Sequence, residues 1–229
     1  MKPTPGSMIT FRRPDGQEVS GYLATPHNAE GAPAIVVIQE WWGLNDQILG
    51  VADRLAQSGY LALVPDLYRG KATAEEEEAH HLMTGLDFGD AASQDIRGAV
   101  QYLKQRTERV GVTGFCMGGR ISFLTACKIS GIKAAAPFYG GGIGGLLEQA
   151  PKITCPLLLF FGDQDPFIPN QEVTTIKSTL AKLNKTAEVV VYPGAPHGFF
   201  CNERDSYRPD AAKDAWERLK AFFKKHLAS

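Results

Sequence analysis

Continuous apolar runs alternate along this chain with segments whose apolar residues recur at helical spacing. The runs cover residues 34–38, 61–64, 110–115, 134–139, 157–161 and 189–192, and such runs are typical of strands buried on both faces of a parallel sheet. Helices are predicted over 45–58, from 75, and over 90–106, 172–183 and 211–227, with Asn45 as an N-cap and Gly59 as a stop. Strands that alternate with helices indicate a doubly wound, mostly parallel sheet.

The first two apolar segments form a different pattern. Residues 8–11 and 19–24 flank Pro14-Asp15-Gly16, a turn signal between two strands that pair side by side. The sequence therefore predicts an antiparallel hairpin at the N-terminal edge of the sheet. Residues 1–7 are rich in Pro and Gly, and we expect them to form a flexible leader outside the fold.

Length and composition limit the function classes. The 229 residues fit one α/β domain over 1–229, and the 24 basic and 25 acidic residues nearly cancel, so we expect no nucleic-acid or membrane partner. The four cysteines show no metal-site spacing, and no run has transmembrane or secretory character. We expect a reduced, soluble, cytoplasmic protein that needs no metal or other cofactor, as a monomer or small homo-oligomer.

The most informative stretch follows the run at 110–115. Gly114-Phe115-Cys116-Met117-Gly118-Gly119 places a thiol between a strand and a helix, with glycines two residues before and two after it. A nucleophile at such an elbow has a strained backbone and requires small neighbours. At a helix N-terminus the helix dipole favours a thiolate. The alternative is a structural cysteine packed as a small hydrophobe.

Three further polar residues follow predicted strands, where functional groups gather in such a sheet. They are Glu40, Asp165 and His197, and the order Cys116, Asp165, His197 is that of nucleophile, acid and histidine in an α/β-hydrolase. His197 would act as base or as the imidazolium partner of a thiolate, held by Asp165. Asp163 is a rival acid two positions earlier. The amides of Met117 and Trp41 are the candidate oxyanion donors.

With these motifs in place, nearly the whole chain resembles the dienelactone hydrolase family of the α/β-hydrolase fold. The resemblance rests on Gln39-Glu40, Pro65-Asp66-Leu67-Tyr68, the cysteine elbow, residues 162–169, His197-Gly198-Phe199 and the closing helix. It implies a Cys-Asp-His triad that opens a cyclic enol-lactone without a cofactor. It also implies that Glu40 holds the resting thiol of Cys116 and takes its proton when substrate arrives.

One feature of the family is not reproduced. The resemblance implies two arginines that clamp a substrate carboxylate, but Glu76 and Cys201 stand at the matching positions. We hypothesise that Arg69 and Arg204 replace them. The aromatic residues near the site, which form either a substrate pocket or core, are Trp41, Trp42, Tyr68, Phe199 and Phe200.

The sequence thus predicts a dienelactone hydrolase-like esterase or lactonase that acts on a small-molecule ester or lactone. A thioesterase or amidase on the same fold is one alternative, and a noncatalytic ligand-binding or redox-sensing protein is another. The glycine cluster at 140–145 lacks the Lys-Ser/Thr of a phosphate loop, so we expect it to form a flexible rim of the site.

Overall fold

A computed structural model describes residues 6–228 of the chain and contains one eight-stranded sheet. The order across the sheet is β1-β2-β4-β3-β5-β6-β7-β8; the β1–β2 and β2–β4 pairs are antiparallel and the other pairs are parallel. This is the predicted doubly wound sheet with an N-terminal hairpin. The strands are β1 (Ser7–Arg12), β2 (Glu18–Ala24), β3 (Ala34–Ile38), β4 (Leu61–Pro65), β5 (Val110–Phe115), β6 (Ala134–Phe138), β7 (Leu157–Gly162) and β8 (Ala187–Tyr192).

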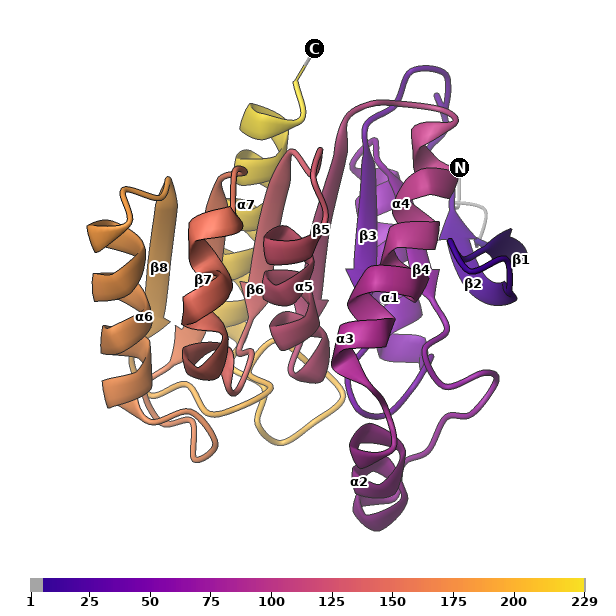
Figure 1. Ribbon diagram of the computed structural model, residues 1–229. Helices are drawn as coiled ribbons and strands as arrows, with labels where there is room; N and C mark the ends of the chain where they lie inside the picture. Colours follow the sequence, from indigo (N-terminus) through magenta and orange to yellow (C-terminus); the bar gives the residue numbers. More distant parts are fainter. Residues whose placement is uncertain (1–5, 229) are drawn as a thin grey trace.

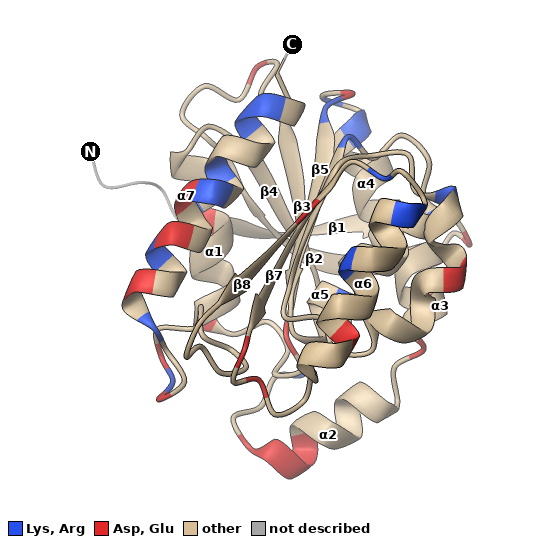
Figure 2. Cartoon of the chain, turned by 90° about the vertical axis from the view of Figure 1, so that its left-hand side faces the viewer, with Lys and Arg blue, Asp and Glu red and all other residues tan. Residues whose placement is uncertain are grey.

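Helices cover both faces of the sheet (Figures 1 and 2). Figure 2 shows α1 (Asp46–Gln57) and α7 (Pro209–His226) on one face, with α4 (Arg97–Lys104), α5 (Met117–Lys128) and α6 (Asn170–Lys182) on the other. α2 (Glu76–Thr84) lies beyond the edge of the sheet toward which the parallel strands point (Figure 1). Every residue of strands β3 to β7 is buried, so apolar burial on both faces stabilises the centre of the fold. Among residues 6–228 no helix is long and apolar enough to cross a membrane.

Local signals place several boundaries correctly. Asn45 caps α1 by accepting a hydrogen bond from the Ile48 amide at 3.1 Å, and Gly59 follows the helix with φ of 95°. In the hairpin, Gly16 has φ of 88° and donates to the carbonyl of Arg13 at 3.0 Å. The expected leader extends one residue too far, because Ser7 already pairs with Leu23 in the sheet. Residues 1–5 of that leader lie outside the described chain.

The helix expected over 90–106 is not uniform. It consists of a short turn α3 (Phe88–Asp90), a π-helix η1 (Ala91–Ile96) and then α4. In the π-helix the Asp95 carboxylate is buried, and it pairs with Arg13 at 3.3 Å and with Arg69 at 2.7 Å. The π-helix, which is wider than an α-helix, coincides with this buried Asp95 side chain. Through its two ion pairs, Asp95 connects Arg13 of the hairpin with Arg69 of the loop after β4.

The prediction of a flexible glycine rim at 140–145 is wrong. The segment continues into a 3-10 helix, η2 (Ile143–Lys152), in which Ile143 and Ala150 are buried. Gly140 lies against the backbone of Gly119 and Arg120, so the segment packs onto the first turn of α5. Backbone packing explains Gly140 and a positive φ of 76° explains Gly142, whereas a Cβ at Gly145 would meet no atom within 4 Å.

Candidate active site

The elbow between β5 and α5 has the strained geometry that the sequence predicts. Cys116 has φ of 56° and ψ of −119°, outside the usual region for a residue with a side chain. A Cβ at Gly114 would overlap the backbone of Gly118, and one at Gly118 would overlap the backbone of Ile38 and Gln39. The turn can therefore form only with glycine on both sides, and it leaves the Cys116 side chain partly exposed.

A buried carboxylate holds the candidate histidine. Asp165 Oδ2 lies 2.7 Å from His197 Nδ1, while Asp165 Oδ1 accepts a 2.9 Å hydrogen bond from the Phe167 amide. The rival, Asp163, instead accepts from the Gly194 amide at 2.7 Å and so closes the turn after β8. The bond to Asp165 favours the tautomer with a proton on His197 Nδ1. The other ring nitrogen, Nε2, then points away from Asp165.

His197 also interacts with the thiol side chain. Burial lowers the pKa of His197, but its hydrogen bonds with Asp165 and Cys116 and their negative charges outweigh burial and raise the pKa to about 10. The imidazolium form is therefore favoured at neutral pH, where it can stabilise a thiolate. The structure thus brings the side chains of Cys116, His197 and Asp165 together.

Glu40 follows β3 and is buried beside this group. Burial raises the pKa of its carboxyl group, while His197, Arg204 and a hydrogen bond from Tyr139 oppose that rise. The Tyr139 hydroxyl donates to Glu40 Oε1 at 3.2 Å. A buried carboxylate whose pKa is raised accepts a proton more readily than one in water.

Tyr139 is a functional candidate that sequence reasoning missed. It follows β6 with φ of 34°, is fully buried, and its ring packs edge-on against His197 with centroids 5.1 Å apart. Its position at the carboxyl end of an apolar run was the available signal, because polar groups there face the same edge of the sheet as Cys116.

The two candidate oxyanion amides belong to segments in direct contact. Met117 is the first residue of α5, and Trp41 lies in the turn after β3, whose backbone passes beside Gly118. Neither amide donates to a backbone acceptor within residues 6–228. Unpaired amides at a helix start can stabilise a negative oxygen.

The aromatic candidates divide into two groups. Tyr68 is close to the elbow, because its hydroxyl donates to the Met117 sulfur at 3.3 Å, and burial followed by the charge of Cys116 raises its pKa. Trp42 packs edge-on against Trp41, with centroids 4.9 Å apart. Phe199 is fully buried between Tyr139 and Tyr192 and belongs to the core, as does Phe200, and Tyr68 and Trp42 are themselves only 6% and 5% exposed.

The two arginine candidates differ in their partners. Arg69 is held by Asp95 and by the carbonyl of Asp66, both at 2.7 Å. The Arg204 guanidinium lies 3.8 Å from the centroid of the Trp42 ring, and its buried Nε has no hydrogen-bond partner within residues 6–228. Because Arg204 also lowers the pKa of Glu40, its charge acts at the site.

Phe167 is a second residue that the sequence did not single out. Its side chain is 70% exposed, and its ring stands edge-on to His197 with centroids 5.2 Å apart. The signal was its place directly after Asp165-Pro166. Within the described chain no group of three His, Cys, Asp or Glu side chains could hold a metal ion.

The mostly parallel sheet, with a sharp elbow after a central strand and a histidine loop after its last strand, defines the α/β-hydrolase fold. Within that class the chain belongs to the dienelactone hydrolase family, whose model matches residues 19–227. It is therefore a hydrolase of the carboxymethylenebutenolidase type.

Individual relatives agree with this assignment. The chain is 37% identical to "Protein usf" of Aquifex pyrophilus, over 97% of this chain and 99% of that protein. It is 36% identical to the "Putative carboxymethylenebutenolidase" of Synechocystis sp., over 92% of this chain and 93% of that one. The crystal structure titled "Putative Dienelactone Hydrolase" from Klebsiella pneumoniae superposes with a TM-score of 0.88 at 32% identity, covering 97% of this chain and 100% of that chain.

Proposed function

We propose that this protein hydrolyses small esters or lactones through a thioester formed on Cys116, with His197 and Asp165 completing a triad. The 2.7 Å bond between His197 Nδ1 and Asp165 Oδ2, beside the elbow, is the observation that carries the proposal. It supports an imidazolium that is available to the thiol and to a leaving group.

The first half-reaction begins with the thiol proton. On substrate binding it passes to the Glu40 carboxylate, leaving a thiolate paired with the His197 imidazolium. The Cys116 sulfur attacks the acyl carbon, and the negative charge that forms on oxygen is stabilised by the Met117 and Trp41 amides. The carbon–oxygen bond then breaks, and the leaving alkoxide takes a proton from His197.

The second half-reaction restores the enzyme. Neutral His197 removes a proton from water as its oxygen attacks the thioester. The tetrahedral intermediate expels the Cys116 thiolate and releases the carboxylic acid. His197 is again imidazolium, and Glu40 returns its proton to sulfur, so one ester and one water become one acid and one alcohol.

The surroundings support a substrate that is anionic and has a planar or apolar acyl group. Arg204 keeps donors available beside Glu40, whereas the charge of Arg69 is paired with Asp95. The Trp42 ring stacks against the Arg204 guanidinium. The exposed Phe167 ring adds apolar surface next to His197. Because a nucleophilic thiol must remain reduced, we also propose that the protein acts in the cytoplasm.

Replacement of the thiol tests the proposal. Wild type, Cys116→Ala and the control Cys127→Ala, which removes a buried cysteine of the same helix, are assayed on p-nitrophenyl acetate and on dienelactone. We expect Cys116→Ala to lose at least about 10³-fold in kcat/KM while its circular dichroism is unchanged, and Cys127→Ala to keep its activity. A trapped acyl group should appear on intact wild-type protein by mass spectrometry and be absent from Cys116→Ala.

Three results separate the readings. Activity retained by Cys116→Ala would refute the nucleophile assignment. Cleavage of only the aryl ester, through Cys116, would keep the triad and exclude dienelactone as substrate. No turnover of either substrate by wild type would favour a ligand-binding role for the fold.

A further inference from the structure

A cavity of about 530 Å³ lies beside α5. The loop before α3, the helix α5 and the 3-10 helix η2 form its walls, and Cys116, Glu40 and His197 are not among its lining residues. Its volume falls within the range of small-molecule sites, which is roughly 300–1,000 Å³. The proposed reaction makes no use of it.

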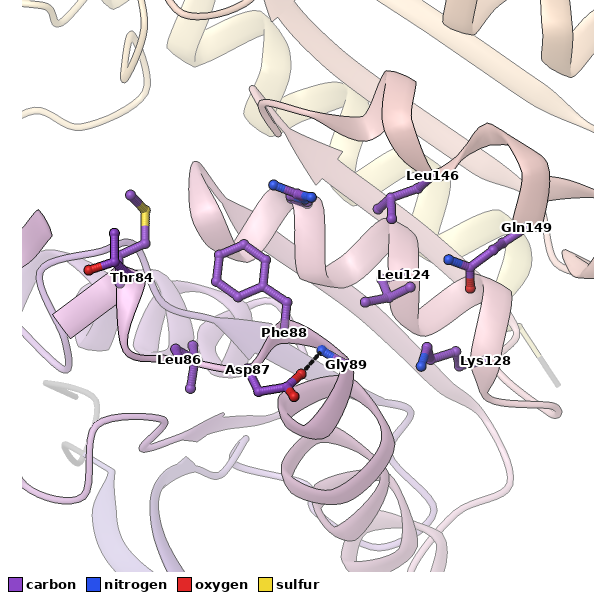
Figure 3. A pocket seen from close by; sticks show the side chains of 11 residues that line it. Thr84, Leu86, Asp87, Phe88, Gly89, Leu124, Lys128, Leu146 and Gln149 are labelled. Atoms are coloured by element: carbon purple, nitrogen blue, oxygen red, sulfur yellow. Dashed lines mark hydrogen bonds between the residues drawn. The ribbon is translucent and has the colours of Figure 1, made fainter. Parts of the chain in front are cut away.

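Apolar and polar side chains share the lining. Leu124 projects from α5 and Leu146 from η2, while Leu86 and Phe88 come from the loop and the start of α3 (Figure 3). All but Leu124 are only partly buried, so these surfaces still face solvent inside the cavity. A bound apolar group would remove that surface from water, which is favourable.

Two cations stand one turn on either side of Leu124 on the same helix face. Arg120 and Lys128 occupy positions four residues before and four residues after it, so all three point to one side of α5. The Arg120 guanidinium stacks over the Phe88 ring at 5.2 Å, and within residues 6–228 it forms no ion pair. Its planar donor edge therefore remains available to a carboxylate.

A carboxylate of the protein lies in the same cavity, and one of its two oxygens accepts backbone hydrogen bonds. Asp87 Oδ1 accepts the amide hydrogen of Gly89 at 2.7 Å (Figure 3). It also accepts the amide hydrogen of Asp90 at 3.0 Å. These two bonds, followed by the charge of Lys128, lower the pKa of Asp87. Among the lining residues one negative charge faces two positive charges, so the lining carries a net charge of +1 and favours an anionic ligand.

We infer that this cavity is a second binding site for a small carboxylate with an aromatic or short aliphatic body. The carboxylate binds between Arg120 and Lys128, and the Gln149 amide at the rim provides a further donor. The apolar body lies on Leu124 and Leu146, against Phe88 (Figure 3).

The test uses 4-fluorophenylacetate as the probe and the full-length protein labelled with ¹⁵N. Saturable shifts are expected for the backbone amides of Gly89, Arg120 and Gln149. Arg120→Gln and Lys128→Gln should each weaken binding about tenfold, because each removes a charge-assisted contact. The neutral amide 4-fluorophenylacetamide should bind about tenfold more weakly than the acid for the same reason.

Two control variants distinguish this site from other modes of binding. Lys177→Gln removes an exposed cation on α6, and Arg204→Gln removes the cation beside Glu40; neither should change the dissociation constant at the cavity. Absence of saturable shifts at these amides, shifts confined to the neighbourhood of Cys116, or equal affinity of Arg120→Gln and wild type would each overturn the inference. The measurement needs no turnover, so it stands or fails independently of the triad.

Discussion

The charge on His197 should contribute to the stability of the folded protein in a defined pH window. Its pKa is raised from 6.5 to about 10, and its side chain is 18% exposed. A shift of this size corresponds to roughly 5 kcal/mol, at 1.36 kcal/mol per pH unit. Because the folded pKa lies above the unfolded one, the contribution is complete below about pH 6.5 and is lost as pH rises through about 10.

Urea unfolding of wild type and His197→Gln at pH 6, 8 and 10 measures this contribution. Tyr and Lys side chains also titrate near pH 10, but they are common to both proteins, so the difference between the two free energies of unfolding isolates His197. We expect that difference to fall by several kcal/mol between pH 6 and pH 10. Esterase activity should also decline as the pH rises toward 10, because a neutral imidazole can no longer protonate the leaving group.

The ring signals of His197 in an NMR titration provide an independent check. In Cys116→Ala the pKa should fall below its wild-type value but stay above 6.5, because the bond to Asp165 remains. A His197 signal that titrates below pH 7 in wild type would refute the imidazolium argument.

Three further predictions follow from the site. Asp165→Asn should lower kcat by about 10⁴-fold, whereas Asp163→Asn should keep most activity because Asp163 closes a turn; steady-state kinetics of both variants compares them. Gly118→Ala should destabilise the fold by about 3 kcal/mol or more, measured by urea unfolding, because its Cβ would overlap backbone rather than a movable side chain. Arg204→Gln should raise KM about tenfold for an anionic ester and leave KM for p-nitrophenyl acetate unchanged; equal effects on both esters would contradict a role in anion binding.

The features predictable from sequence are those with a local physical cause. The run at 34–38 predicted β3 because continuous burial needs continuous apolar residues, and Asn45 and Gly59 bounded α1 because capping is a short-range hydrogen-bond requirement. The elbow at Cys116 was also predictable from a local cause, because a side chain at Gly114 or Gly118 would overlap the backbone next to the turn.

The features that sequence reasoning missed depend on contacts between distant segments. The Tyr139 hydroxyl donates to Glu40, 99 positions away in the chain, and the two meet because β5 pairs with β3 on one side and with β6 on the other. Arg69 looked like a free cation beside the site until Asp95, 26 residues away, proved to be its buried partner. The glycines at 140–142 suggested mobility because sequence shows their lack of side chains but not the helix that packs against them.

The arrangement of the sheet brings together two side chains, Cys116 and His197, that the ribosome synthesises at different times. The thiol comes from the end of β5, but its histidine comes from the loop after β8, so about 80 residues separate their synthesis. At a typical elongation rate this interval lasts about 4–16 s. During that interval His197 has not yet been synthesised, so no imidazole lies beside Cys116. The contacts among Cys116, His197 and Asp165 therefore form only after β7 and β8 have joined the sheet.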